Sequence, residues 1–428
     1  MLKVKGRHFE LNGKPFFYLA DTAWLLFSKL TLEETKRYLE TRAAQGFNVI
    51  HATLVHHRDY HLCEDAGRTA LQDNDFARPS MDRDGQGYWD RVEEVVKEAG
   101  RLGLHMGLVL SWGTLVQSGA LNTENCTAYL RHIVSRFSSY DHVIYILGGD
   151  IRGSVNPQLY RTMGRYLKAH SPNQLVGYHP FGRCSSSLWF RGEAWLDFHM
   201  FQSGHRDRSQ RTLGAWDDNP VPEEEWFGEE NWKYVERDRA WDDKPTLDGE
   251  PSYEGIPHGL HDPLRPYWTA REVRRYCWWS LLSGAAGFTY GHNATMQFYR
   301  KGDEGSYGVR ETWQEALMAP GAGQMRFARE LLEKCHFEEG VPRPDLLLEN
   351  GEEDTYVPVL ASDDAILAYS YPGTEIQFGS LPFTPVSACF FDPASGDIVR
   401  TAATSDGRYR FPKRAGDTDW VLVLKARI

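Results

Sequence analysis

The chain lacks several features that mark familiar functional classes. Its six cysteines are widely scattered and form no CxxC pair, so the usual cysteine signatures of metal and redox sites are absent. A chain of 428 residues is also too large to need disulfides for its stability. No run of 18 apolar residues occurs, so no membrane-spanning helix is expected. The net charge is −11 without any basic run, which disfavours nucleic acids and anionic membranes as partners.

The first twenty residues, MLKVKGRHFELNGKPFFYLA, have neither the apolar h-region nor the small-residue cleavage site of a signal peptide. We therefore expect a cytoplasmic location, in a reducing environment. The sequence gives no indication of oligomeric state.

Aromatic residues are abundant, at 13% of the chain, and 14 of them are tryptophans. Exposed aromatic rings stack on sugar faces, so a carbohydrate is a candidate partner. Buried tryptophans also fill interfaces between strands and helices, and composition does not separate the two roles. With 41% hydrophobic residues, the chain can form two or three domains, one of them as large as a barrel of about 250 residues.

Strand and helix patterns alternate along the first 340 residues. Thr31 and Glu34 have the spacing of a capping box, which predicts the start of a helix. Further helices are expected over Thr123–Ser139, with Thr123 as N-cap, and over Glu311–Lys334. The predicted strands are Phe16–Ala20, Asn48–Val55, Leu104–Trp112, Val143–Leu147, Gln174–Tyr178, Asp197–Gln202, Pro245–Asp248 and Ala286–Tyr290. Eight such units predict an α/β fold, a (β/α)8 TIM barrel, and no GxGxxG follows the first strand to favour a doubly wound sheet.

The pattern changes after Gly340, where short strands separated by turn residues replace the alternation and no helical pattern occurs. The predicted strands are Asp345–Leu348, Tyr356–Leu360, Ala365–Tyr371, Glu375–Phe378, Ala388–Asp392, Tyr409–Phe411 and Asp419–Leu424. They predict a small all-β sandwich. The expected domains are a catalytic barrel over residues 1–340 and a β-sandwich over residues 341–428.

Two predicted barrel strands end in a carboxylate beside glycine or proline. Asp150 follows two glycines in VIYILGGD, and Glu250 precedes a proline in KPTLDGEP. The site of a (β/α)8 barrel lies at the carboxyl ends of its strands, so both side chains are expected at one site. A pair of carboxyl groups is what acid–base or nucleophilic cleavage of a glycosidic bond requires. Glu250 could instead be a structural ion-pair partner, and Glu254 competes for its role.

The other strand ends carry polar or aromatic side chains that can hydrogen-bond a sugar hydroxyl or stack on a ring. Only one of the adjacent His56 and His57 can face the site, because neighbouring side chains of a strand point to opposite sides. Long inserts at 56–87, 181–195 and 203–230 can enclose a pocket. The candidate substrate-binding residues are Asp21, Trp24, His57, Trp112, His179, Gln202, His205, Glu254 and Tyr290.

These segments together resemble the apiosidase-like glycoside hydrolases, a barrel family allied to the retaining clan A enzymes. The resemblance spans nearly the whole predicted barrel. Members also carry a C-terminal β-sandwich of a type named for collagen binding, which fits the residues after 340. The matching stretches are LADTAWLLFSKLTLEETKRYLETRAAQGFNVI (19–50), ILGGD (146–150), GYHPFGRCSSSLWF (177–190), WLDFHMFQSGH (195–205), KPTLDGEPSYEGIP (244–257) and GAAGFTYGHNATMQFY (284–299).

The resemblance implies that Asp150, in the GGD motif, is the acid/base and that Glu250, in the DGEP motif, is the nucleophile. It implies a retaining glycosidase that needs no metal or cofactor. An exo-acting enzyme for a pentofuranoside, such as a β-apioside in a plant cell-wall glycan or glycoside, is the expected activity. After Asp150 the chain reads Ile-Arg-Gly, whereas many members have an Arg-Asn-Pro-like segment, and this leaves the sugar and the linkage open.

Two other functional classes remain open. Several histidines near one barrel mouth could bind a metal ion, as in amidohydrolases, but those enzymes usually carry HxH on the first strand, where this chain has Ala20-Asp21-Thr22. A non-catalytic carbohydrate-binding protein would keep the aromatic residues without needing two carboxylates at strand ends.

Overall fold

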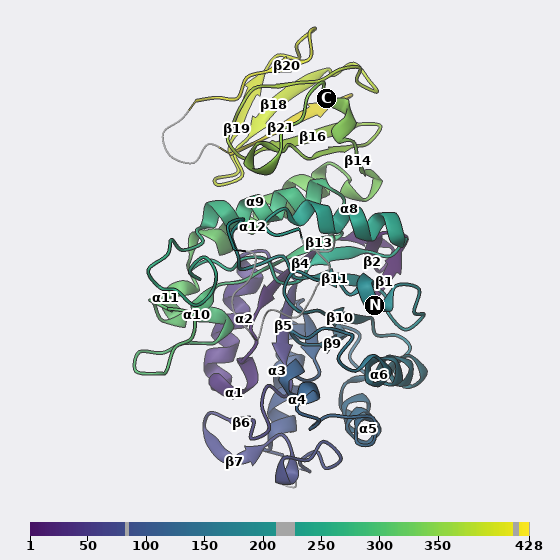
Figure 1. Ribbon diagram of the computed structural model, residues 1–428, viewed down its shortest axis with the longest axis vertical. Helices are drawn as coiled ribbons and strands as arrows, with labels where there is room; N and C mark the ends of the chain where they lie inside the picture. Colours follow the sequence, from purple (N-terminus) through teal and green to yellow (C-terminus); the bar gives the residue numbers. More distant parts are fainter. Residues whose placement is uncertain (82–84, 211–226, 414–418, 428) are drawn as a thin grey trace.

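The computed structural model describes residues 1–81, 85–210, 227–413 and 419–427, and its larger part is the predicted (β/α)8 barrel (Figure 1). Eight parallel strands are hydrogen-bonded in the order β10-β9-β8-β5-β4-β13-β12-β11. The Asp197 backbone N–H donates to the Val176 carbonyl at 2.8 Å where β11 returns to β10, so the sheet is nearly closed. The strands are β4 (Tyr18–Thr22), β5 (Val49–Thr53), β8 (His105–Val109), β9 (Val143–Gly148), β10 (Val176–His179), β11 (His199–Phe201), β12 (Thr246–Asp248) and β13 (Gly287–Tyr290).

Helices surround the barrel, and every residue of the eight strands is buried between them and the interior, as parallel sheets require. The capping box predicted at Thr31 and Glu34 is confirmed at the start of α2. The longer helices are α2 (Leu32–Ala44), α3 (Tyr88–Arg101), α5 (Cys126–Phe137), α6 (Pro157–His170), α8 (Asn231–Trp241), α9 (Ala270–Leu282) and α12 (Pro320–Lys334). Short elements in the connections are α1 (Leu26–Lys29), β6 (His61–Leu62), β7 (Asp65–Thr69), η1 (Gln72–Asn74), α4 (Gly113–Gln117), α7 (Ser187–Phe190), α10 (Asn293–Met296) and α11 (Trp313–Ala316).

Two helix predictions are wrong in their bounds. The helix expected from Thr123 begins at Cys126, because the Asn122 side chain accepts the backbone N–H groups two and three residues later and holds a turn there. The single helix expected over Glu311–Lys334 is two helices, α11 and α12. Pro320 cannot donate a backbone hydrogen bond and instead opens α12.

A three-stranded antiparallel sheet precedes the barrel and is not among the predicted elements. Its strands are β1 (Leu2–Lys5), β2 (His8–Leu11) and β3 (Lys14–Phe16). Asn12 and Gly13 both adopt positive φ, 52° and 80°, in the tight turn between β2 and β3. The Phe9 ring packs 5.3 Å from that of Tyr18 and 5.4 Å from that of Phe198, so this sheet covers the end of the barrel where the strands begin.

The C-terminal part is an antiparallel β domain, as predicted. A six-stranded sheet in the order β14-β15-β16-β21-β18-β19 is accompanied by the pair β17 and β20. The strand expected at Asp345–Leu348 is wrong: a 3-10 turn that begins at Pro344 occupies this segment. The elements are η3 (Phe337–Glu339), β14 (Val341–Pro342), η4 (Pro344–Leu346), η5 (Glu353–Thr355), β15 (Val359–Ala361), β16 (Ala365–Ser370), β17 (Ile376–Gln377), β18 (Ser387–Phe391), β19 (Ile398–Thr401), β20 (Arg408–Tyr409) and β21 (Trp420–Lys425).

The six-stranded sheet packs directly on the barrel, above α9 and α12 (Figure 1). Alternate residues of β16 separate two cores, since Leu367 and Tyr369 join the core of the barrel whereas Ile366 and Ala368 face the small domain's own core. Trp278 of α9 stacks on Tyr369 with ring centroids 6.0 Å apart. The two domains therefore share one continuous apolar interface.

A buried ion pair crosses this interface, and its loss should destabilise the protein. Arg274 of α9 donates to both carboxylate oxygens of Asp419, at 2.9 and 3.0 Å. We expect Asp419→Ala to lower the free energy of unfolding by about 3–5 kcal/mol, because it leaves a buried guanidinium without its carboxylate. Denaturant titration would measure this. The matched control is Asp243→Ala, which removes an exposed partner of Arg7 and should change stability little. Equal, small effects of both substitutions would contradict the assignment.

Among the helices of the described ranges, none combines the length and the apolar character needed to cross a membrane.

Candidate active site

A pocket of about 190 Å³ lies at the carboxyl ends of the barrel strands. Residues that follow each of the eight strands contribute to its wall. Among the described residues these are Trp24, Leu25, His56, Trp112, Asp150, Phe181, Gly182, Gln202, Gly204, His205, Arg206, Glu250, Tyr253, Ile256, Leu260, Met296, Gln297, Ser306 and Tyr307.

Asp150 enters the pocket through a sharp turn after β9. Gly148, Gly149 and Asp150 all have positive φ, at 89°, 88° and 55°. A Cβ on Gly148 would lie 2.2 Å from the carbonyl oxygen of His179, and one on Gly149 would lie 2.7 Å from that of Ser111, so only glycines fit before the aspartate. The two glycines of the GGD motif therefore have a steric purpose: they let the chain turn Asp150 towards the barrel axis.

The surroundings of Asp150 favour its protonated form. Burial and the nearby charge of Glu250 raise the pKa of the Asp150 carboxyl to about 7, although a hydrogen bond from the Gln202 side chain acts in the opposite direction. A carboxyl group with such a pKa keeps its proton below about pH 7 and can donate it there.

The surroundings of Glu250 favour its ionised form. Burial alone would raise its pKa, but the imidazoles of His179 and His205 outweigh that effect and hold the pKa well below its usual range. His205 Nε2 lies 2.9 Å from Oε1 of Glu250, and His179 Nε2 lies 3.2 Å from Oε2. The pocket therefore holds one proton-carrying carboxyl and one carboxylate.

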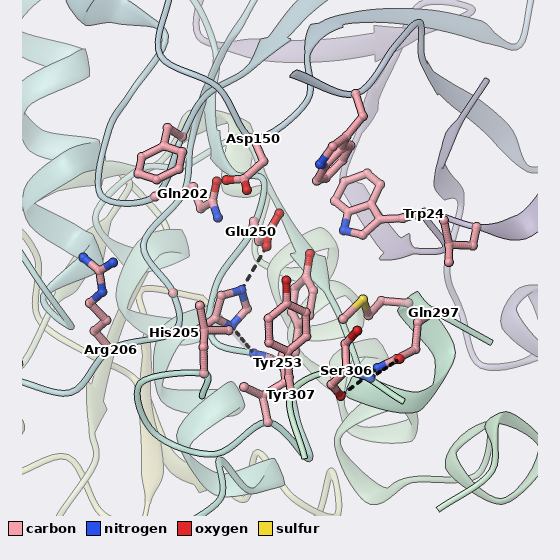
Figure 2. Close-up of a pocket in the computed structure, with 18 of the residues that line it drawn as sticks. Trp24, Asp150, Gln202, His205, Arg206, Glu250, Tyr253, Gln297, Ser306 and Tyr307 are labelled. Carbon is pink, nitrogen blue, oxygen red and sulfur yellow. Dashed lines mark hydrogen bonds and ion pairs between the residues drawn. The ribbon is translucent and has the colours of Figure 1, made fainter. Parts of the chain in front are cut away.

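Aromatic rings form the sides of the pocket. The Trp24 and Trp112 rings lie 5.3 Å apart, and His56 stacks on Trp112 at 4.8 Å. Figure 2 shows Trp24 on one side, Gln202 and His205 on the other, and the two carboxyl groups between them. Such a wall offers apolar faces for a sugar ring next to groups that can perform acid–base chemistry.

The structure brings most of the predicted residues to the pocket. Trp24, Trp112, Gln202 and His205 line it together with the two carboxyl groups. His179 is fully buried and does not form part of the wall, but its Nε2 lies 3.2 Å from Oε2 of Glu250.

Four predicted residues lie elsewhere, and the prediction that they line the pocket is corrected. Asp21 points outward to α2, where it pairs with Arg42 at 2.6 Å and accepts a hydrogen bond from Tyr38. Tyr290 also points away from the pocket and donates to Glu254 at 2.7 Å. Glu254 further accepts the Gly321 backbone N–H of α12 at 3.0 Å. These side chains join the barrel to its helices. Asp21 and Tyr290 lie on strands, and the alternation along each strand turns them outward.

His57 is the fourth predicted residue that does not line the pocket. Its side chain is about half exposed and lies near Asp59, whereas its neighbour His56 lines the pocket. Burial lowers the pKa of His56 to about 3, so it presents a neutral ring.

Two pocket tyrosines are not among the predicted residues. Tyr253 is buried and its hydroxyl donates to Thr22 at 3.1 Å. Tyr307 has a φ of 53°, and Asn293 holds this conformation by donating to its carbonyl at 2.8 Å. Burial together with the charges of Asp150 and Glu250 raises the pKa of Tyr307 to about 12. The position of Tyr253, three residues after Glu250, is a local sequence signal for a place in the pocket. No local sequence pattern indicates the same for Tyr307.

No three histidine, cysteine, aspartate or glutamate side chains converge to hold a metal ion anywhere in the described ranges.

Similar solved structures show the class of protein to which this barrel belongs. A solved structure described as a glycoside hydrolase is 34% identical, with a TM-score of 0.93 over 99% of this chain and 96% of that one. A glycoside hydrolase family 5 structure from Bacteroides vulgatus ATCC 8482 is 32% identical, with a TM-score of 0.92 over 99% and 93%. An endo-1,4-beta-D-mannanase from Thermotoga petrophila RKU-1, at 16% identity and a TM-score of 0.52 over 74% and 100%, shares the fold alone. The barrel is glycoside hydrolase-like.

The family follows from the sequence comparison. Residues 3–339 match the model of the "Apiosidase-like, catalytic domain", and residues 341–425 match that of the "Putative collagen-binding domain of a collagenase". The chain belongs to the apiosidase-like family, as the resemblance indicated. A search of curated proteins gave no match.

Proposed function

We propose that this protein is a retaining glycoside hydrolase with Glu250 as nucleophile and Asp150 as acid/base. The observation that carries the proposal is that two carboxyl groups share one pocket in different surroundings: burial and the charge of Glu250 raise the pKa of Asp150, whereas contacts with His205 and His179 lower that of Glu250. Pairs of titratable groups whose environments push their pKa values apart identify the acid and the nucleophile of such sites. A retaining mechanism predicts that the carboxyl groups of Asp150 and Glu250 lie about 5–5.5 Å apart in the working enzyme.

The proposed reaction has two displacements. Asp150 donates its proton to the glycosidic oxygen while Glu250 attacks the anomeric carbon, so the bond to the leaving group breaks and a glycosyl ester forms. Asp150, now ionised, then removes a proton from water, which attacks the same carbon and releases Glu250. Each group ends the cycle in its starting protonation state.

The proposed substrate is a terminal pentofuranoside, such as a β-apioside of a plant cell-wall glycan or glycoside. The family membership supports the sugar class, and the small pocket with contributions from all eight strand ends supports exo action. The inserts predicted to enclose it contribute in part: His56, Phe181 and the segment after β11 line the pocket, and residues 211–226 lie outside the described ranges.

A panel of aryl pentosides and hexosides, with apiosides and arabinofuranosides included, tests the proposal. We expect turnover of a pentofuranoside, and release of single sugars from the ends of a glycan. A ladder of internal fragments from a polysaccharide would overturn exo action. Absence of turnover on every glycoside would instead favour a non-catalytic carbohydrate-binding protein, and loss of activity on metal removal, with a stoichiometric metal in the purified protein, would favour a metal-dependent hydrolase.

The two pKa shifts predict a bell-shaped pH dependence of kcat/KM. The active form has Glu250 ionised and Asp150 protonated, so activity should rise as pH increases through the lowered pKa of Glu250 and fall above about pH 7, where Asp150 loses its proton. Initial rates on a glycoside with a poor leaving group would show both limbs. In Asp150→Ala, assayed on an activated glycoside, the alkaline limb should disappear. Its persistence would assign that limb to another group.

A further inference from the structure

Glu250 is held between two imidazole rings, one at each carboxylate oxygen. His205 Nε2 faces Oε1 at 2.9 Å, and His179 Nε2 faces Oε2 at 3.2 Å. The side chains of His179, His205 and Glu250 are 0%, 4% and 9% exposed. These rings, rather than solvent, therefore determine the immediate surroundings of the carboxylate.

Backbone N–H groups determine which nitrogen of each ring carries the proton. Asp150 donates its backbone N–H to His179 Nδ1 at 3.3 Å, and Tyr253 donates its backbone N–H to His205 Nδ1 at 3.4 Å. An N–H group can donate only to a ring nitrogen that has no proton. Nδ1 is thus the acceptor in both rings, and the proton is on Nε2. His205 donates this proton to Glu250, whereas His179 Nε2 lies close to Oε2 without forming a hydrogen bond.

The backbone around both histidines is fixed as well. The His205 carbonyl accepts the Gly259 backbone N–H at 2.8 Å and the Trp268 indole N–H at 3.2 Å. The His179 carbonyl accepts the Gly149 N–H at 3.1 Å, in the turn that presents the acid. Figure 2 shows His205 placed between Glu250 and Tyr253, with a hydrogen bond on each side of its ring.

We propose that His205 is a positioning residue that holds Glu250 in its attacking orientation as a neutral Nε2–H donor, while the His179 ring packs against the other carboxylate oxygen. The inference rests on the proposed function and specifies how its nucleophile is held. Glu250 loses its negative charge when it becomes a glycosyl ester. Neutral donors suit that step, because imidazolium ions would then be left as buried charges without a partner.

Glutamine and asparagine substitutions separate this role from simple packing. A glutamine side chain can place its amide N–H near the position of Nε2, whereas asparagine ends near Nδ1 and cannot reach Glu250. We expect His205→Gln to keep kcat/KM within about tenfold of wild type, and His205→Asn to lose on the order of 10- to 100-fold. The acidic limb of the pH profile should move up by about one unit in His205→Asn only.

His292 provides the matched control. Its Nδ1 accepts the Ala294 backbone N–H at 3.1 Å and its Nε2 lies 3.1 Å from Glu311, but it does not line this pocket. His292→Asn should therefore leave the acidic limb unchanged. A shift as large as that of His205→Asn would mean that the effect is not specific to Glu250.

Other titratable groups also face Glu250 and remain in every variant. They are His179 of β10, Asp150 after β9, His51 of β5, Tyr253 on the same loop and Tyr307 after α10. Because these groups are unchanged, a change in the pKa of Glu250 can be attributed to the loss of the histidine donor.

The closing experiment needs no turnover, so it stands apart from the test of the proposed function. Enzyme labelled with 13C at glutamate carboxyl groups is titrated by NMR, with the Glu250 signal identified by its loss in Glu250→Gln. We expect Glu250 to titrate at higher pH in His205→Asn than in wild type, and near wild type in His205→Gln. The inference is overturned if His205→Asn titrates like wild type, or if His205→Gln and His205→Asn shift alike.

Discussion

Glu250→Gln is expected to reduce turnover by on the order of 10⁴- to 10⁶-fold on every glycoside, whatever its leaving group. An amide of the same shape keeps the packing and can still accept the His205 hydrogen bond, but it is not a nucleophile. The loss should therefore appear in kcat rather than in KM. Steady-state kinetics of the purified variant on an activated and on an unactivated glycoside would measure it.

Glu254→Gln is the matched control, since Glu254 is the competing carboxylate four residues later. Glu254 accepts hydrogen bonds from Tyr290 and from the Gly321 backbone, and a glutamine carbonyl can accept both. This variant should keep turnover close to wild type. If Glu254→Gln were inactive and Glu250→Gln active, the assignment of the nucleophile would be wrong.

Asp150→Ala is expected to show an effect that depends on the leaving group. Proton transfer by a positioned acid contributes about 10²- to 10⁴-fold, so glycosides with poor leaving groups should lose that much. The leaving group of an activated aryl glycoside departs without a proton. The first step on such a substrate should therefore be nearly unaffected by the substitution. A series of aryl glycosides with different leaving-group pKa values would give a steep dependence for the variant and a shallow one for the wild type.

Azide distinguishes the two carboxyl groups independently. In Asp150→Ala it can attack the glycosyl ester in place of base-activated water, so it should restore turnover and give a glycosyl azide with retained configuration. Equal and total loss of activity in both variants on an activated substrate, without such rescue, would contradict the assigned roles.

The barrel could be predicted because its signals are local. Apolar runs that alternate with amphipathic helices specify a (β/α)8 fold, and the carboxyl ends of its strands then bring Asp150 and Glu250 to one pocket although they are a hundred residues apart. The turn Asn12-Gly13 was an equally local signal for the N-terminal hairpin, but the flanking strands have only three or four residues and little alternation.

Side-chain direction at the strand ends could not be predicted, because it depends on the register and pleat of the barrel. Asp21 and Tyr290 are paired in register on adjacent strands, and both turn outward to the helices. Asp21 contacts Tyr38 and Tyr290 contacts Glu254, and no sequence pattern predicts either partner. His56 and His57 lie in a bend after β5 rather than on the strand, and His56 is the one that lines the pocket.

Tyr307 illustrates a second limit. Its position depends on long-range hydrogen bonds: Asn293 donates to its carbonyl, and the Tyr267 hydroxyl donates to the carbonyl of Gly308. Contacts of this kind exist only in the folded chain, so a residue outside the strand ends can reach the pocket without any local signature.

The stereochemistry of the product tests the central claim most directly. In the presence of methanol, a glycosyl ester on Glu250 can be opened by the alcohol, and the methyl glycoside formed does not mutarotate. NMR should show a methyl glycoside with the same anomeric configuration as the substrate, because two displacements restore it. A product of inverted configuration would show a single displacement and contradict the assignment of Glu250 as nucleophile.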